Sequence, residues 1–332
     1  MSCIENAKRA IIPNDVIASL TEIYRYIGKS DNYYKVTIND YDRIVSQTIE
    51  RDTFFLAKLV GLDITDNRLR LIITKNSSPR SNDERVLYTI KELLTEYMAN
   101  PNKLGLDSVS LLNLENYIYP KNGIKYDLRR INPNASGKTK REIIQEIGEM
   151  YENSLKTGSV ERIILLINYF IDLTAIKPFT ERNELVPYLV LYGLLKRSNV
   201  NALSYVSLFE KIYFSKDEFD SELKNSCNNW EEGYHQTLPF VRYFINLLKE
   251  LFKHCDRIIT NYEDDLNINK GDNIENTIMN LPNMFTKEEV RLNHPYVSES
   301  TINRALKKLH EEGIIRPLGK GRSAKWLKVG FK

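Results

Sequence analysis

Charged and amide side chains that could do chemistry gather in one short segment, residues 177–184, with the sequence KPFTERNE. An apolar run with helical character precedes it (163–176), and a second one follows it (185–195). A short polar loop between two buried helices is a common place for functional side chains, because the helices hold it rigidly. The pattern predicts a functional loop in the middle of a helical core.

A second candidate for binding is the segment 120–141, which carries seven basic side chains and one acid. Asn, Gly and Pro interrupt it, so we expect an exposed loop or short hairpin with a positive face. Residues 132–139, NPNASGKT, are similar to a phosphate-binding P-loop with Asn132 in place of the first Gly. The residues before them are too polar for the buried strand of a P-loop, and no parallel-sheet pattern follows. We exclude the P-loop, since Ser136 as a helix N-cap explains the same residues.

The composition limits the class of protein. The 332 residues are 42% hydrophobic and 27% charged, as in soluble globular proteins. No run approaches the roughly 18 apolar residues of a membrane span, and the N-terminus lacks a signal-peptide pattern. Three widely spaced cysteines fit neither a disulfide framework nor a zinc site, and four scattered histidines argue against a metal cluster. We expect a soluble, cytoplasmic protein with no membrane partner.

Helical patterns dominate the chain up to residue 259, whereas residues 64–81 are less regular. The expected helices cover residues 14–30, 41–61, 83–98, 108–119, 139–155, 160–176, 185–195 and 237–259. Residues 260–274 are polar and acidic, which is typical of a linker. We therefore divide the chain into an N-terminal helical region (1–120), a core (121–262), a linker (263–274) and a C-terminal domain (275–332).

The C-terminal domain has the order helix, helix, turn, helix and two-stranded tail, which predicts a winged helix-turn-helix. From Thr286 onward, eleven Lys and Arg stand against five Glu, so this part carries +6 and the remainder of the chain −3. The charge separation predicts DNA binding; a dimerisation or lid module with a solvated basic face is the alternative. The expected DNA contacts are Ser300, Asn303, Arg304, Lys307, Lys308, Lys320, Arg322 and Lys325.

The segment KPFTERNELVPY resembles the motif of Fic (Fido) proteins, H-P-F-x-D/E-G-N-G-R-x-x-R, which lies between two buried helices. VSQTIERD (45–52) is similar to the family's inhibitory segment, and many members end in a winged helix. The resemblance covers roughly residues 15–330. It implies a mainly α fold: a helical bundle with a small β-hairpin flap, followed by a winged helix. It also implies transfer of AMP from a nucleotide to a protein hydroxyl, with ATP and Mg²⁺ as cofactors and a protein target as partner.

Several motif positions differ from the family pattern. The matching residues are Pro178, Phe179, Glu181 (the acid that holds Mg²⁺ in the family) and Asn183. The replaced residues are Lys177 at the histidine base, Arg182 and Glu184 at the two glycines, and Leu185 and Tyr188 at the two arginines.

These replacements bear on every part of the family's chemistry. A lysine base titrates near ~10.4 and would need its pKa lowered by several units to act at neutral pH. Arg182 and Glu184 would hinder a positive φ and the approach of the backbone to phosphate. Loss of a general base alone typically costs ~10²–10⁴-fold in rate. The pattern predicts a lapsed site.

The inhibitory-like segment keeps Ser46 and Glu50, but its glycine position is Arg51 and its arginine partner position is Tyr188. Glu50 could instead pair with Arg182 or Lys177 as a structural clasp. The alternative is that Ser46 and Glu50 are an ordinary exposed pair on a helix.

Three hypotheses follow for the function. The leading one is a Fic-like pseudoenzyme that acts as a DNA-binding regulator or an adaptor. The second is an active nucleotidyltransferase that uses Lys177 and Mg²⁺ on Glu181. The third is a sensor that binds a nucleotide without turnover. A homodimer is a further possibility. The richness in Lys, Asn, Ile and Tyr is compatible with an AT-rich bacterial genome.

Overall fold

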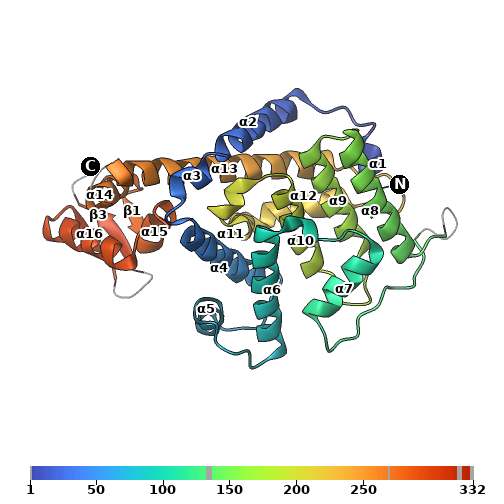
Figure 1. The fold of residues 1–332 in the computed structure, drawn as a ribbon, viewed down its shortest axis with the longest axis horizontal. Coiled ribbons are helices and arrows are strands. Elements are labelled where there is room, and N and C mark those ends of the chain that lie inside the picture. Colours follow the sequence, from blue (N-terminus) through green and yellow to red (C-terminus); the bar gives the residue numbers. More distant parts are fainter. Residues whose placement is uncertain (1, 132–136, 268–269, 320–323, 330–332) are drawn as a thin grey trace. The chain divides into compact units, whose positions relative to one another are not determined.

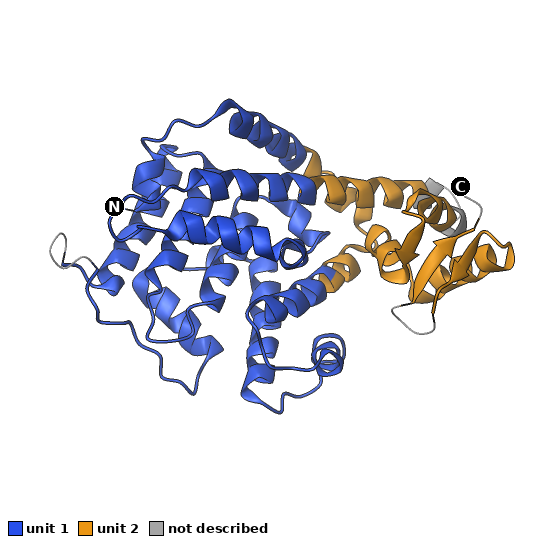
Figure 2. Ribbon diagram, turned by 180° about the vertical axis from the view of Figure 1, so that it is seen from behind, with its two compact units in different colours: residues 1–28, 48–251 blue, residues 29–47, 252–332 orange. Residues whose placement is uncertain are grey.

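The computed structural model describes residues 2–131, 137–267, 270–319 and 324–329. The chain forms two compact units (Figure 2). The first consists of residues 1–28 and 48–251, and the second of residues 29–47 and 252–332. Within the described residues, every helix is too short or too polar to cross a lipid bilayer.

The first unit is helical, and two consecutive helices form its centre: α9 (Arg162–Ile176) and α10 (Leu185–Arg197) (Figure 1). Helices α1, α8, α10 and α12 pack against α9, and α6 packs against α10. The surrounding elements are α1 (Cys3–Ala7), α5 (Asp66–Lys75), α6 (Asn82–Ala99), η1 (Pro101–Lys103), α7 (Ser108–Ile118), α8 (Lys140–Thr157), η2 (Asn201–Ser204), α11 (Leu208–Phe214) and α12 (Lys216–Cys227). Three helices have residues in both units: α2 (Asn14–Ser30), α4 (Tyr41–Leu59) and α13 (Leu238–Asn267).

The sequence of α9 explains its central place. Glu161 caps its N-terminus, because the carboxylate accepts the backbone N–H groups of Ile163 (2.9 Å) and Ile164 (2.8 Å). Every residue from Ile163 to Leu173 is buried, as an apolar surface on all sides of a helix predicts. The predicted helix over 160–176 is thereby confirmed.

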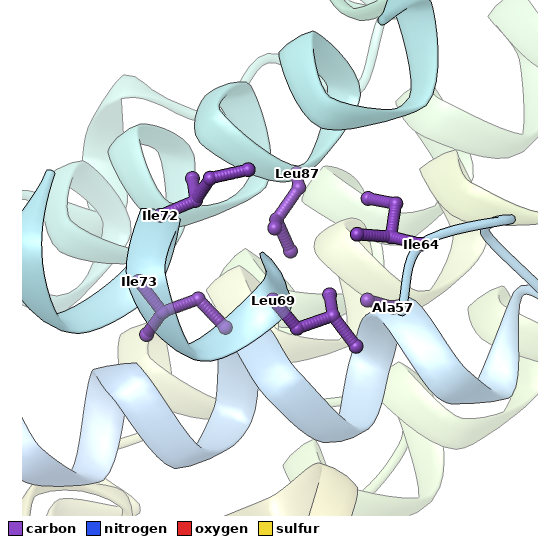
Figure 3. Close-up of a cluster of buried hydrophobic side chains, with 6 residues drawn as sticks. All are labelled: Ala57, Ile64, Leu69, Ile72, Ile73 and Leu87. Carbon is purple, nitrogen blue, oxygen red and sulfur yellow. The ribbon is translucent and has the colours of Figure 1, made fainter. Parts of the chain in front are cut away.

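A small satellite core lies between α4, α5 and α6 (Figure 3). The less regular segment 64–81 in fact contains α5, whose Leu69, Ile72 and Ile73 recur at helical spacing and point into this cluster. They pack with Ala57 and Leu87 from the neighbouring helices. The stripe is short, and only the contact with α4 and α6 makes a ten-residue helix stable.

The C-terminal part of the second unit combines three helices with a three-stranded antiparallel sheet of order β1-β3-β2. Its elements are α14 (Lys270–Asn280), β1 (Met284–Thr286), α15 (Lys287–Asn293), α16 (Glu299–Glu311), β2 (Ile315–Pro317) and β3 (Lys325–Lys328). The tail was expected to have two strands; β1 is the third, because it pairs with β3. Of the segment 263–274, residues 263–267 belong to α13 and residues 270–274 to α14.

Residues 29–47, which include α3 (Tyr33–Thr37), belong to this second unit. The Tyr33 and Tyr262 hydroxyls donate to the carboxylates of Asp256 (2.8 Å) and Asp40 (3.1 Å), respectively. The ring of Tyr262 also packs edge-on against that of Tyr296. These contacts join the early segment to the last third of the chain.

Candidate functional site

The predicted functional loop starts where α9 ends at Lys177. Lys177 is exposed and has a left-handed backbone, with φ of 45°. Its carbonyl accepts a hydrogen bond from the buried Lys140 Nζ at 2.9 Å, and the same ammonium forms an ion pair with Asp127 at 2.9 Å. Lys140 therefore ties the start of the loop to the segment 120–131.

The basic segment 120–131 pairs with the loop as a short strand would. The backbone N–H of Asp127 donates to the Pro178 carbonyl, and that of Thr180 donates to the Lys125 carbonyl, both at 2.9 Å. These bonds flank an antiparallel bridge between Tyr126 and Phe179. A second antiparallel bridge joins Arg130 to Thr139, whereas residues 132–136 of the expected hairpin lie outside the described residues. The basic segment 120–131, which matches the flap that the resemblance predicts, thus lies against the loop at 177–184.

Asn183 organises the inside of the loop. Its Oδ1 accepts the Phe179 N–H at 2.8 Å, and its Nδ2 donates to the Phe179 carbonyl at 3.0 Å. Phe179 itself is buried, with its ring beside that of Tyr126. Both polar groups of the amide are thus engaged by the backbone of the loop, and Phe179 fastens the loop to the core.

The two glycine positions of the resemblance behave differently. Arg182 adopts φ of 60°, so the left-handed turn is kept without a glycine, which corrects the expectation that arginine would hinder a positive φ. Such a conformation costs a non-glycine residue on the order of 1 kcal/mol or more. The Arg182 guanidinium lies over the Tyr119 ring at 5.6 Å, a cation–π contact that helps to offset the cost. Glu184 has helical backbone angles (φ −85°) and directly precedes α10.

The two arginine positions hold one buried and one half-buried side chain, and both pack against the core. Leu185 is completely buried at the start of α10. The Tyr188 ring packs against Phe170, Phe209 and Phe219, with ring centroids 5.9 to 6.1 Å apart. Neither side chain is a cation, and neither is placed to meet an anion.

Glu115, which the sequence did not single out, is buried beneath this loop on α7. Neither carboxylate oxygen has a hydrogen-bond partner among the described residues. Burial, followed by the nearby negative charge of Glu184, raises the pKa of Glu115 to about 9, and Arg182 opposes the shift. Glu115 is therefore a neutral acid at pH 7. The sequence pattern could have indicated that Glu115 is buried, because it continues the buried stripe of Leu111 and Ile118 at helical spacing.

Comparison with known proteins gives a fold but no sequence match. No protein-family model matches the chain, and no curated protein matches it. A crystal structure of a Fic family protein from Desulfovibrio desulfuricans G20 superposes with a TM-score of 0.56 over 97% of this chain and 98% of that one, at 10% identity. The chain has a Fic-like fold.

A second solved structure leads to the same conclusion. It is a Fic domain containing signaling protein from Bacteroides thetaiotaomicron VPI-5482, with a TM-score of 0.56 and 13% identity. The match covers 72% of this chain and 98% of that one. At identities this low, the structural similarity establishes the Fic-like fold alone. The chemistry of the site has to be argued from the residues of this chain.

The inhibitory-like segment lies on α4, and three of its side chains contact residues 204–210. Thr48 donates to the Ser204 carbonyl at 3.2 Å, and Arg51 forms a two-point ion pair with Glu210. Asp52 accepts the Ser207 hydroxyl at 2.7 Å, and burial raises its pKa to about 7. These contacts fasten α4 to the start of α11. The clasp from Glu50 to Arg182 or Lys177 stays a prediction, and so does the role of Ser46.

Residues that could hold a metal ion are not grouped in the described part of the Fic-like chain: no three His, Cys, Asp or Glu side chains converge. Glu181 is exposed, and its carboxylate accepts a long hydrogen bond from Asn122 Nδ2 at 3.4 Å. A groove of about 490 Å³ lies between residues 104–107 and α8. None of the predicted site residues lines this groove.

The predicted DNA-contacting residues of α16 are all exposed, as are those described on the sheet. Ser300, Asn303, Arg304 and Lys307 lie on one side of α16, opposite the buried Ile302, Leu306 and Leu309. Lys308 instead forms a two-point ion pair with Glu275 of α14, at 2.8 Å to each oxygen. Lys325 is exposed on β3, whereas Lys320 and Arg322 lie outside the described residues.

Proposed function

We propose that this protein is a Fic-fold protein that has lost nucleotidyl transfer and acts as a DNA-binding regulator or adaptor. The observation that carries the first half is that a fully buried Leu185 and a half-buried Tyr188, packed among aromatic rings, stand at the positions where the family motif has arginines. A triphosphate carries several negative charges, and its binding requires cations or a nest of free N–H groups. The two positions provide neither a cation nor such a nest.

The other motif positions support the same proposal. Asn183 is engaged by the backbone of Phe179, and Glu184 places a carboxylate at the second glycine position. Among the described residues, Glu181 belongs to no group of three His, Cys, Asp or Glu side chains that could hold a metal ion. The residues present therefore do not fit a Mg²⁺-nucleotide, and we derive no catalytic step through it.

The DNA-binding half rests on the C-terminal domain, which we propose is a winged helix. Its order of helix, strand, helix, helix and two further strands, with the sheet order β1-β3-β2, supports this proposal. Asn303, Arg304 and Lys307 of α16 form an exposed row that could enter a major groove, and Lys325 adds a cation on the sheet. Lys308 contributes less, because Glu275 neutralises it.

Titration of full-length protein with random-sequence duplex DNA at two salt concentrations tests this half. We expect binding that weakens steeply with salt, since counterions are released from phosphates. Replacing both Arg304 and Lys307 with Ala should lower the slope of log K against log salt by about 1 for each phosphate that these two side chains bind. Lys156→Ala, which removes an exposed lysine from α8, is the matched control. Absence of binding, or binding without salt dependence, would contradict the proposal.

One observation favours the alternative, an active nucleotidyltransferase. The backbone is left-handed at Arg182, and the flap pairs with residues 178–180. The backbone conformation is therefore compatible with that of an active loop. Incubation with labelled ATP, CTP, GTP and UTP and a cell lysate tests this alternative. Label transfer to protein that Lys177→Ala abolishes would establish it and would refute the loss of catalysis.

A further inference from the structure

Four aromatic side chains form a continuous row on the first unit, which we call the aromatic row: Phe54 and Phe55 of α4, and Tyr213 and Phe214 of α11. The Phe55 ring lies 5.3 Å from that of Phe54, 5.3 Å from Tyr213 and 5.6 Å from Phe214. Helices α4, α5 and α11, which carry and flank it, are neighbours in the fold (Figure 1). The row is separate from the loop at 177–184.

The aromatic row is open to solvent. Phe214 is 74% exposed and Tyr213 is 37% exposed, while Phe54 and Phe55 are half-buried. A single exposed aromatic side chain is ordinary, but four that are connected through Phe55 form an apolar patch of the kind that marks an interface. Burial of large aromatic side chains supplies much of the free energy at protein interfaces.

Opposite charges lie at the two ends of the aromatic row. At the α5 end, the guanidinium of Arg70 and the ammonium of Lys58 lie over the Phe54 ring, at 5.6 and 5.8 Å from its centroid. Lys58 is paired with Asp66, whereas Arg70 forms no ion pair with the described residues. At the other end, α12 begins just after Phe214 and exposes Asp217 and Glu218. The row thus has a basic end and an acidic end.

We propose that the aromatic row is the contact surface for a second copy of this chain. A two-fold axis through an apolar centre places the basic end of one copy on the acidic end of the other, and the reverse contact forms at the same time. A partner of a single charge sign, such as a nucleic acid, would be repelled at one end of the row. A second copy satisfies both ends, and the aromatic rings of the two copies cover each other.

Sedimentation velocity of the full-length protein over a wide range of concentrations tests the proposal. We expect a concentration-dependent species of twice the chain mass of 38.8 kDa. Phe214→Ser should weaken the dimer about tenfold or more, because it removes the most exposed aromatic side chain of the row from the interface. Phe214 is largely exposed, so the monomer should keep its fold, which a urea unfolding curve checks. Leu128→Ser, at an 82% exposed leucine of the flap, is the matched control and should have no effect.

Charge reversal separates this arrangement from non-specific association. Arg70→Glu should weaken the dimer, and so should the double change Asp217→Lys and Glu218→Lys. The three changes combined in one chain exchange the two ends and should give a tighter dimer than either parent variant. A protein that stays monomeric at every concentration would overturn the proposal. A dimer that Phe214→Ser leaves intact, or a combined variant no tighter than its parents, would overturn it equally.

Discussion

The side-chain amide of Asn183 forms two hydrogen bonds with the backbone of one residue, Phe179: Oδ1 accepts its N–H at 2.8 Å, and Nδ2 donates to its carbonyl at 3.0 Å. The asparagine that matches the family motif therefore closes the loop on itself. Phe179 in turn is buried beside Tyr126 of the flap, so the clamp also fixes the place where the flap pairs.

Asn183→Ala should destabilise the protein by about 1–3 kcal/mol, because two partly buried hydrogen bonds are removed and the Phe179 backbone is left without these partners. Asn183→Asp keeps the acceptor but sets a carboxylate oxygen against the Phe179 carbonyl, so it should also destabilise the protein. Urea unfolding measures both free energies. Equal stability of Asn183→Ala and the wild type would show that the clamp contributes nothing.

Glu115 should make the protein less stable as the pH rises. Its pKa is about 9 in the folded protein, above the ordinary value, so the folded protein holds this proton more tightly than the unfolded chain. The stabilising contribution is complete below the unfolded pKa of ~4.3 and is lost progressively up to pH 9, by about 1.4 kcal/mol per pH unit.

Glu115→Gln removes the titrating proton and keeps the shape of the side chain. It should therefore stabilise the protein at pH 7 to 9 and flatten this part of the stability curve. Glu181→Gln is the control, since Glu181 is exposed on the loop above. The same dependence of unfolding free energy on pH in the two variants would contradict this role of Glu115.

Leu185→Arg, which restores the first arginine of the family motif, should unfold the protein rather than restore function. The side chain at this position has no solvent access, and an unpaired buried guanidinium costs several kcal/mol. Leu185→Met, a change of similar volume, should cost less than about 1.5 kcal/mol and serves as the control. A folded Leu185→Arg protein that binds ATP would show that the core at this point can open.

Much of the helical frame could be predicted because its helices carry long apolar stripes or strong caps. The run from Ile163 to Leu173 and the capping carboxylate of Glu161 define α9 without any tertiary information. Helix α5 was not predicted, because Leu69, Ile72 and Ile73 form only a short apolar stripe. The helix is stable only when this stripe packs against Ala57 and Leu87.

The site was harder to predict than the frame. Spacing and family resemblance located the loop, but not the bond from Lys140 to the Lys177 carbonyl, which joins residues 37 apart in sequence. The left-handed backbone of Arg182 was also unexpected, because its cation–π contact with Tyr119 depends on tertiary structure. Glu115 could have been suspected from its place in a buried stripe, whereas the absence of a partner among the described residues could not.

Calorimetric titration of the full-length protein with ATP and Mg²⁺ tests most directly our proposal that the loop at 177–184 binds no nucleotide. We expect no heat beyond that of dilution at any ATP concentration, because Leu185 and Tyr188 provide no cation at the two motif positions where arginines would meet phosphate. Saturable heat that disappears in Lys177→Ala, with the variant still folded by circular dichroism, would contradict the claim and place a nucleotide site in this loop.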